Sequence, residues 1–139
     1  MRHFVVTLIS LIFLTNNAFA SRDKAFLECT IGNDLKLASN GTIERHTITS
    51  KWGKFHVDRR SGRISGKDVT TDNYTVQVLD VGEDGESFEL VAYTDGYEGN
   101  EGLHRRALFL VIQLFVASED KPFLLYDMGF THSGLCRYE

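Results

Sequence analysis

Short extended segments separated by turn residues run through most of the chain, and stretches with a helical repeat of apolar residues are hard to find. The clearest turn is Asn40-Gly41, two residues that tolerate positive φ and stand between the extended segments 36–38 and 42–44. Two more hairpins are predicted around turns at 59–62 and 82–86. The sequence therefore predicts an all-β fold of about seven to nine strands, joined largely as an antiparallel meander.

Two further segments carry expectations about the sheet. Gly32-Asn33-Asp34 is expected to turn the chain after an extended segment at 25–31, because these residue types favour turns. The segment 107–117 is apolar apart from Gln113, and such strands are usually central and covered on both faces. A helix beginning near Leu103 is the alternative, but the density of phenylalanine, valine and isoleucine favours a strand.

The first twenty residues are typical of a cleavable secretory signal. A basic start precedes the apolar run 4–14, and Ala18 and Ala20 occupy the two small-residue positions of the cleavage pattern. The run is about half as long as the roughly 20 apolar residues that a membrane-spanning helix needs. We therefore predict a signal peptide at 1–20 and a single secreted domain at 21–139. The mature domain is expected to have no membrane span and to be secreted from the cytoplasm, into a bacterial periplasm.

The chain contains two cysteines, Cys29 and Cys136, which stand near opposite ends of the predicted mature domain. In an oxidising compartment they are expected to form a disulfide that ties the first strand to the last. A redox or metal-binding pair is the alternative, but the two cysteines lack the C-x-x-C spacing of such sites. Both a small antiparallel β-barrel and a β-sandwich fit the strand pattern. The barrel is favoured because this bridge could hold a closed sheet at its seam.

The charge balance narrows the range of partners. Fifteen lysines and arginines stand against 19 aspartates and glutamates, which gives a net charge of −4. This balance argues against nucleic acids and anionic membranes as partners. A protein in the same compartment or a small apolar ligand is the expected partner.

Glycines and acidic residues are concentrated at 94–102, in a segment that joins two strongly predicted strands. Binding proteins often place their contact residues on such loops. We expect Asp95, Tyr97, Glu98 and Glu101 to contact a partner. Cation binding is an alternative, although these acidic residues do not follow the spacing of calcium loops. A solvated connection without a binding role is the simplest alternative.

A basic cluster marks the turn of the second predicted hairpin. Arg59, Arg60, Arg63 and Lys67 lie close together in the sequence and could receive an anionic ligand or an acidic partner. The alternative is a solubilising turn, which is the commoner role of such residues.

Residue patterns for catalysis and for metal binding are weak. No nucleophile motif occurs, and His46, His56, His104 and His132 lie on separate segments. His56 and Asp58 are alternate positions of one predicted strand, so a third ligand from His104 or His132 could complete a zinc-type site. We assign no catalytic residue, no metal ligand and no cofactor from these patterns.

Three functions therefore compete. The expected architecture is similar to that of small periplasmic β-barrel inhibitors and of lipocalin-like ligand carriers, although the chain has the signature residues of neither group. The sequence has no recognisable set of catalytic residues, and it has an acidic loop that contains an aromatic residue. These two features favour a non-catalytic binding or inhibitor-type module that acts through its loops. A lipocalin-like carrier of a small apolar ligand is the second possibility, and a metal-assisted hydrolase is the third.

Overall fold

The computed structural model describes residues 24–46, 53–94, 97–99, 102–104, 106–127 and 129–139, so the predicted signal peptide lies outside the described residues. The prediction of an all-β fold is confirmed. In the described ranges the one helical element is a short 3-10 turn, η1 (Glu83–Gly85), and no helix could cross a membrane. The strands are β1 (Phe26–Leu37), β2 (Ile43–His46), β3 (Lys54–Asp58), β4 (Arg63–Gly66), β5 (Thr75–Val81), β6 (Ser87–Tyr93), β7 (Tyr97–Gly99), β8 (Gly102–His104), β9 (Ala107–Gln113), β10 (Lys121–Asp127) and β11 (Phe130–Tyr138).

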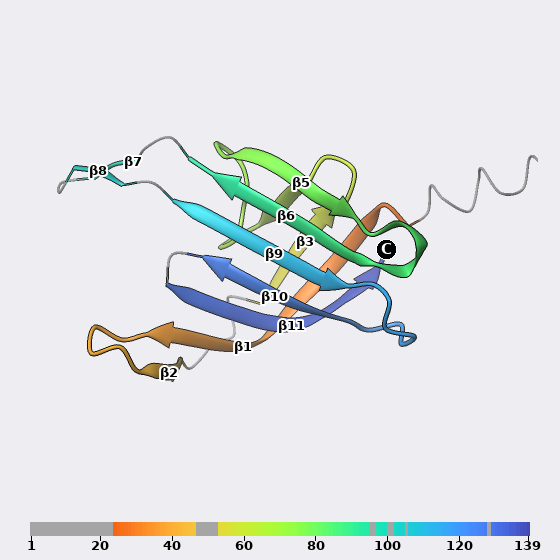
Figure 1. Cartoon of the computed structure of the whole chain (residues 1–139), viewed down its shortest axis with the longest axis horizontal. Coiled ribbons are helices and arrows are strands. Elements are labelled where there is room, and N and C mark those ends of the chain that lie inside the picture. The colour runs from red at the N-terminus through yellow and green to blue at the C-terminus, as the bar shows by residue number, and fades with distance from the viewer. Residues whose placement is uncertain (1–23, 47–52, 95–96, 100–101, 105, 128) are drawn as a thin grey trace, which may run out of the picture.

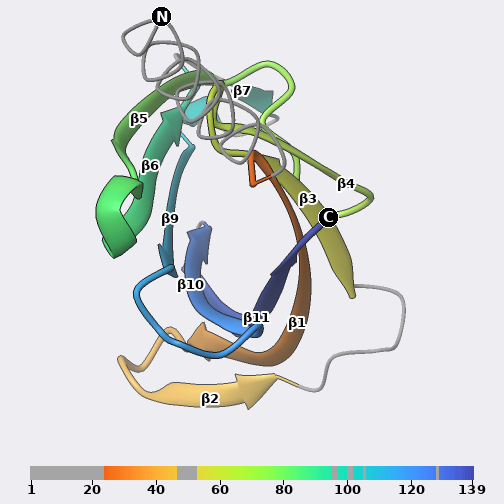
Figure 2. The same cartoon turned by 90° about the vertical axis from the view of Figure 1, so that its right-hand side faces the viewer.

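Nine strands form one antiparallel sheet that curls into a nearly closed barrel (Figure 2). The strand order is β4-β3-β1-β11-β10-β9-β6-β5, and β2 pairs with the second half of β1. β7 and β8 form a separate two-stranded hairpin that projects beyond β6 and β9 at one end of the barrel (Figure 1). Of the two predicted architectures, the barrel is therefore the correct one.

All three predicted hairpins are present. The Asn40-Gly41 turn joins β1 to β2, with Gly41 at a φ of 84° and the Asn40 side-chain oxygen accepting a hydrogen bond from the Thr42 amide (3.0 Å). The turn at 59–62 joins β3 to β4, and η1 lies in the turn between β5 and β6. Local turn chemistry was thus sufficient to locate these connections.

Contrary to expectation, Gly32-Asn33-Asp34 does not turn the chain. β1 continues through these residues as one strand, and its register against β11 shifts between Ile31 and Asn33, so that Gly32 forms a β-bulge. β11 pairs with nearly the whole length of β1. On the other edge of β1, β3 pairs with the first half of that strand and β2 pairs with the second half. These long-range ladders outweigh the local turn preference of the three residues.

β9 is shorter and less covered than predicted. It ends at Gln113, because residues 114–120 form the turn that leads to β10. Its side chains alternate between buried positions inside the barrel and half-exposed positions outside, the latter including Phe109 and Val111. Among the described residues no second layer packs on this outer surface. The prediction of a strand covered on both faces is therefore wrong.

The barrel interior holds the hydrophobic core. Two of its members, Phe55 and Phe123, meet edge to face with their ring centroids 5.2 Å apart. Its buried members are Leu27, Cys29, Ile31, Phe55, Val57, Ile64, Val69, Phe88, Leu90, Ala92, Leu108, Leu110, Ile112, Leu114, Phe123, Leu125 and Cys136. Side chains from strands throughout the sheet thus fill the interior, as is usual for a small barrel.

The predicted disulfide is confirmed. Cys29 on β1 and Cys136 on β11 are cross-strand partners, and both are fully buried in the core. The bridge therefore ties together two strands that are already hydrogen-bonded neighbours. The open seam of the barrel lies elsewhere, between β4 and β5, so the expectation that the bridge closes the seam is wrong.

Side chains, rather than strand pairing, close the seam. The Arg59 guanidinium donates hydrogen bonds to the carbonyl oxygens of Val81 (3.0 Å) and Gly82 (3.1 Å) at the end of β5. The β3–β4 turn also packs on β5, because a Cβ atom on Gly62 would lie 2.6 Å from a methyl carbon of Val76. These contacts fasten the β3–β4 hairpin to the opposite side of the seam.

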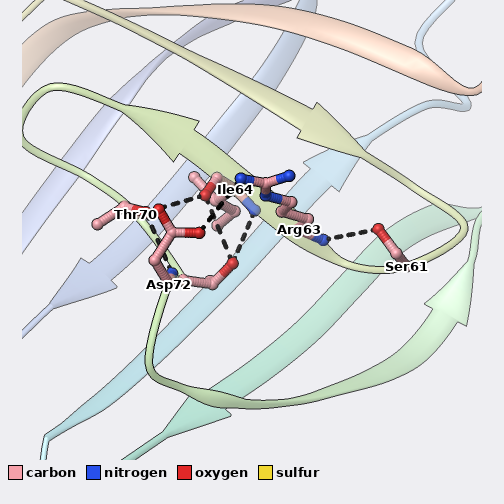
Figure 3. Close-up of polar contacts among 6 residues, drawn as sticks. Ser61, Arg63, Ile64, Thr70 and Asp72 are labelled. Carbon is pink, nitrogen blue, oxygen red and sulfur yellow. Dashed lines mark hydrogen bonds and ion pairs between the residues drawn. The ribbon is translucent and has the colours of Figure 1, made fainter.

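The residues that follow β4 cover its free edge (Figure 3). The Ile64 amide donates a hydrogen bond to Thr71 Oγ1 (2.8 Å), and the Thr71 amide donates one to the Ile64 carbonyl oxygen (3.0 Å). The Thr70 hydroxyl donates to the same carbonyl (3.3 Å). Exposed strand edges invite pairing with other chains, so this connection protects the sheet at its seam.

Candidate binding surface

Outward side chains of three neighbouring strands form an apolar surface on the barrel wall, which we call the β9 face. Its members are Val91 and Tyr93 on β6, Ala107, Phe109 and Val111 on β9, and Leu124 and Tyr126 on β10. Leu124 is 47% exposed and Tyr126 is 46% exposed. Contiguous exposed apolar patches are typical of interaction sites.

The strand register joins these side chains into continuous rows. Tyr126 lies opposite Phe109, which in turn lies opposite Val91. In the next row Leu124 lies opposite Val111. Cross-strand partners of this kind have their Cβ atoms about 5 Å apart. The β9 face is therefore one uninterrupted apolar surface across β10 and β9.

An acidic residue borders the β9 face on β6. Glu89 lies opposite Val111 of β9 on one side and opposite Asp80 of β5 on the other. It is half-buried, and its carboxylate makes no hydrogen bond or ion pair with any described residue. Asp80 accepts a hydrogen bond from the Gly82 amide (2.7 Å). Two acidic residues are thus cross-strand partners in the β5–β6 pair.

The outer surface of β1, β3 and β11 is charged, and its charges are matched. It contains an open depression of about 310 Å³ that is lined by Glu28, Thr30, Lys54, Asp120, Leu135 and Arg137. Lys54 forms an ion pair with Glu28 (2.7 Å), and Arg137 binds Asp120 through two nitrogens. Hydrogen bonds from these two bases hold the pKa values of Glu28 and Asp120 below their usual range. The charges of this depression therefore satisfy one another.

The predicted acidic loop belongs to the β7–β8 hairpin. Tyr97 and Glu98 lie on β7, whereas Asp95 and Glu101 lie outside the described residues. A backbone hydrogen bond of 3.0 Å closes the base of the hairpin. Because β7 follows β6 and β8 precedes β9, the hairpin extends from one end of the β9 face (Figure 1).

The three predicted arginines do not converge on one basic site. Arg59 is engaged at the seam, and its guanidinium also lies 6.0 Å from the centre of the Tyr138 ring. Arg63 pairs with Asp72 (3.4 Å), as Figure 3 shows. Arg60 is exposed, and its side chain makes no bond with a described residue. It shares with Arg59 a depression of about 140 Å³. Arg59 therefore has a structural role at the seam, while a binding role for the three arginines stays a prediction.

At the end of the barrel that carries the β7–β8 hairpin, some of the inward-facing residues are polar. His132 on β11 faces Asp34 on β1, with 3.1 Å between His132 Nδ1 and a carboxylate oxygen, and both residues are buried. Burial raises the pKa of Asp127 on β10, and the nearby charges of Arg106 and His132 oppose this rise. Burial and the charge of Asp127 raise the pKa of Tyr74. His132 is the one member of this group that was a candidate site residue from the sequence.

His56 and His132 are not brought together in a metal site. His56 lies on the outside of β3, where its Nδ1 contacts Glu139, whereas His132 is buried inside the barrel. The Asp58 carboxylate caps the following turn by accepting a hydrogen bond from the Arg60 amide (3.0 Å). Within the described ranges no group of three histidine, cysteine, aspartate or glutamate side chains could hold a metal ion.

Sequence reasoning missed the β9 face and Glu89. The apolar segment 107–117 indicated an apolar strand, but this strand was expected to be covered on both faces, so its exposed outer side was not predicted. Leu124 and Tyr126, two positions apart on β10, could have indicated that the neighbouring strand is apolar on its outer side as well. Which strands are neighbours, however, depends on the topology.

Comparisons of the chain with protein families, with curated proteins and with solved structures found no match.

Proposed function

We propose that the protein is a non-catalytic binding module of the periplasm or the extracellular space. It recognises a protein partner with the β9 face and the adjoining β7–β8 hairpin. The observation that carries the proposal is the β9 face itself, where exposed aromatic and aliphatic side chains adjoin on neighbouring strands. Aromatic residues are enriched at the centres of protein interfaces, and the face presents Tyr93, Phe109 and Tyr126.

The scaffold supports this proposal because it holds the β9 face rigid. β9 is paired along its length with β6 on one side and with β10 on the other. Its inward side chains belong to the hydrophobic core. A surface that is ordered before the partner arrives loses little conformational entropy on binding. The hairpin that carries Tyr97 and Glu98 stands beside this surface and would form the rim of the interface.

Affinity capture with matched variants tests the proposal. The domain 21–139 is immobilised and exposed to an extract of its own compartment, alongside Leu124→Gln and Leu135→Gln. The two leucines are 47% and 48% exposed, but Leu124 lies on the β9 face and Leu135 lines the charged depression. Loss of a central contact typically costs about 1–2 kcal/mol, so Leu124→Gln is expected to weaken capture roughly ten-fold.

Leu135→Gln is expected to capture the partner as well as the wild-type domain does. A double change of Tyr97→Ala and Glu98→Ala tests the hairpin in the same assay and should weaken capture more mildly. Equal loss with both leucine variants, or no loss with either, would show that the β9 face is not the contact surface.

A further inference from the structure

We infer that the partner of the β9 face is a cationic protein that places an arginine against Glu89 and covers β9 with apolar side chains. This inference rests on the proposed function and specifies the chemistry of its partner. Among the outward residues of β6, β9 and β10, all of which the structure describes, Glu89 is the one charged residue. It is therefore the position at which the face can select the charge of a partner.

The carboxylate of Glu89 lacks a compensating charge. Its cross-strand neighbours are Val111 and Asp80, and no base among the described residues pairs with it. Like charges in directly opposite sheet positions destabilise the pair. Elsewhere on the barrel wall the carboxylates of Glu28 and Asp120 each have a basic partner. The acidic pair on β5 and β6 has no such partner, and a basic residue of a bound protein would supply one.

The face cannot supply that base to a second copy of itself. The outward residues of β5, β6, β9 and β10 include no lysine, arginine or histidine. A two-fold dimer packed through this face would bring the same surface from both copies, and so would add carboxylates to carboxylates. Burying uncompensated charges is costly. The net charge of −4 adds to this repulsion.

Arginine fits this position better than lysine does. Its planar guanidinium forms two parallel hydrogen bonds with one carboxylate, and it is less strongly hydrated than an ammonium group. It also stacks on aromatic rings, which the β9 face offers at Phe109 and Tyr126. The expected partner surface therefore combines an arginine with apolar or aromatic groups within reach of β9.

Two tripeptide probes test the inference without knowledge of the partner. Acetyl-Trp-Leu-Arg-amide and acetyl-Trp-Leu-citrulline-amide have nearly the same shape, but citrulline is neutral. Each is titrated into the isotope-labelled domain 21–139 while amide chemical shifts are followed by NMR. Both peptides are expected to shift amides of β6, β9 and β10. The arginine peptide should bind roughly three-fold more tightly at low salt, the usual range for a partly exposed ion pair.

Glu89→Gln is the matched variant. It keeps the size of the side chain at a half-exposed position, so the fold should be retained, and it should remove the preference for arginine over citrulline. Equal affinities of the two peptides for the wild-type domain would overturn the inference while leaving the proposed function standing. If neither peptide shifts amides of the β9 face at millimolar concentration, the proposed function fails as well.

Sedimentation velocity tests the alternative occupant. The wild-type domain is expected to remain monomeric as its concentration is raised, because the acidic pair repels a second copy. A dimer that forms in the wild-type domain and is lost in Leu124→Gln would identify a second copy as the occupant and overturn the inference.

Discussion

Gly134 on β11 packs so closely against the bulge of β1 that there is no room for a side chain at this position. A Cβ atom there would lie 2.0 Å from the Thr30 carbonyl oxygen and 3.0 Å from the Gly32 amide nitrogen. Both are backbone atoms of the paired strand, so they cannot move away without disrupting the β1–β11 ladder. The side chain of Phe123, 2.9 Å from the same point, closes the third direction.

Gly134→Ala is therefore expected to reduce the free energy of unfolding by about 3 kcal/mol, as measured by urea denaturation. Gly53→Ala is the control, because a Cβ atom on Gly53 would meet nothing within 4 Å. That substitution should change the free energy by less than about 0.5 kcal/mol. Similar losses in the two variants would contradict the close approach described for Gly134.

The raised pKa of Asp127 predicts how one carboxyl affects stability across pH. Burial is the main cause, so the ionised carboxylate is less favourable in the folded chain than in the unfolded chain. The stability contributed by the protonated form is complete below the ordinary pKa of 3.8 and is lost as the pH rises through the higher folded value.

Asp127→Asn, which does not titrate, should therefore raise the thermal midpoint at pH 7. The difference from the wild-type chain should shrink towards zero below about pH 3, where the aspartate is protonated in both states. A midpoint difference that stays constant across this range, or has the opposite sign, would show that ionisation of Asp127 does not govern the effect.

At the scale of elements, the β3–β4 hairpin depends on Arg59 for its attachment to β5. The guanidinium bonds carbonyl oxygens on the far side of the seam, where no strand pairing exists. Arg59→Met keeps much of the side-chain volume but removes these bonds, and should cost about 2 kcal/mol of unfolding free energy. Arg60→Met is the matched neighbour and should cost almost nothing. Equal effects in denaturant unfolding would argue against the seam contact.

The elements that could be predicted from sequence are those specified by neighbouring residues. The hairpin at Asn40-Gly41 follows from the positive φ that its turn requires. Gly32-Asn33-Asp34 misled the prediction because the same residue types also suit a bulge, and only the partner β11 decides between the two. The prediction for the outer side of β9 was wrong because an apolar pattern indicates which residues are apolar, and does not indicate whether a second layer covers them.

At the scale of the whole molecule, composition and turn spacing were enough to predict an all-β fold, and the two cysteines of an exported chain were enough to predict the bridge from Cys29 to Cys136. The choice of a barrel over a sandwich depended on a bridge across the seam, which the structure does not have. The position of the seam was not predictable, because no local pattern states which strands lie side by side. The candidate site divides in the same way. Tyr97 and Glu98 were predicted as contact residues from their acidic, glycine-rich segment, whereas the setting of Glu89 required the register of β5, β6 and β9.

The disulfide acts on the molecule as a whole because it joins residues 107 positions apart. Closing a loop of that size restricts the unfolded chain by about 4 to 5 kcal/mol in the chain-entropy model. The double variant Cys29→Ala with Cys136→Ala should lose at least that much unfolding free energy, measured by urea denaturation, since it also leaves space in the core. A loss below about 1 kcal/mol would show that the bridge does not restrict the unfolded chain to the extent expected.

The neighbouring positions of β1 and β11 have a consequence for chain connectivity. The Glu139 amide donates a hydrogen bond to the Phe26 carbonyl oxygen (3.2 Å), so a short linker could join the two termini of the described domain. A circular permutant cut between the exposed residues Lys67 and Asp68 would then run through β5, β6, β9, β10, β11, β1, β3 and β4 in the order in which they adjoin around the wall. Its strands would be paired almost entirely with their sequence neighbours, and such low contact order is expected to make it refold faster than the natural order of strands.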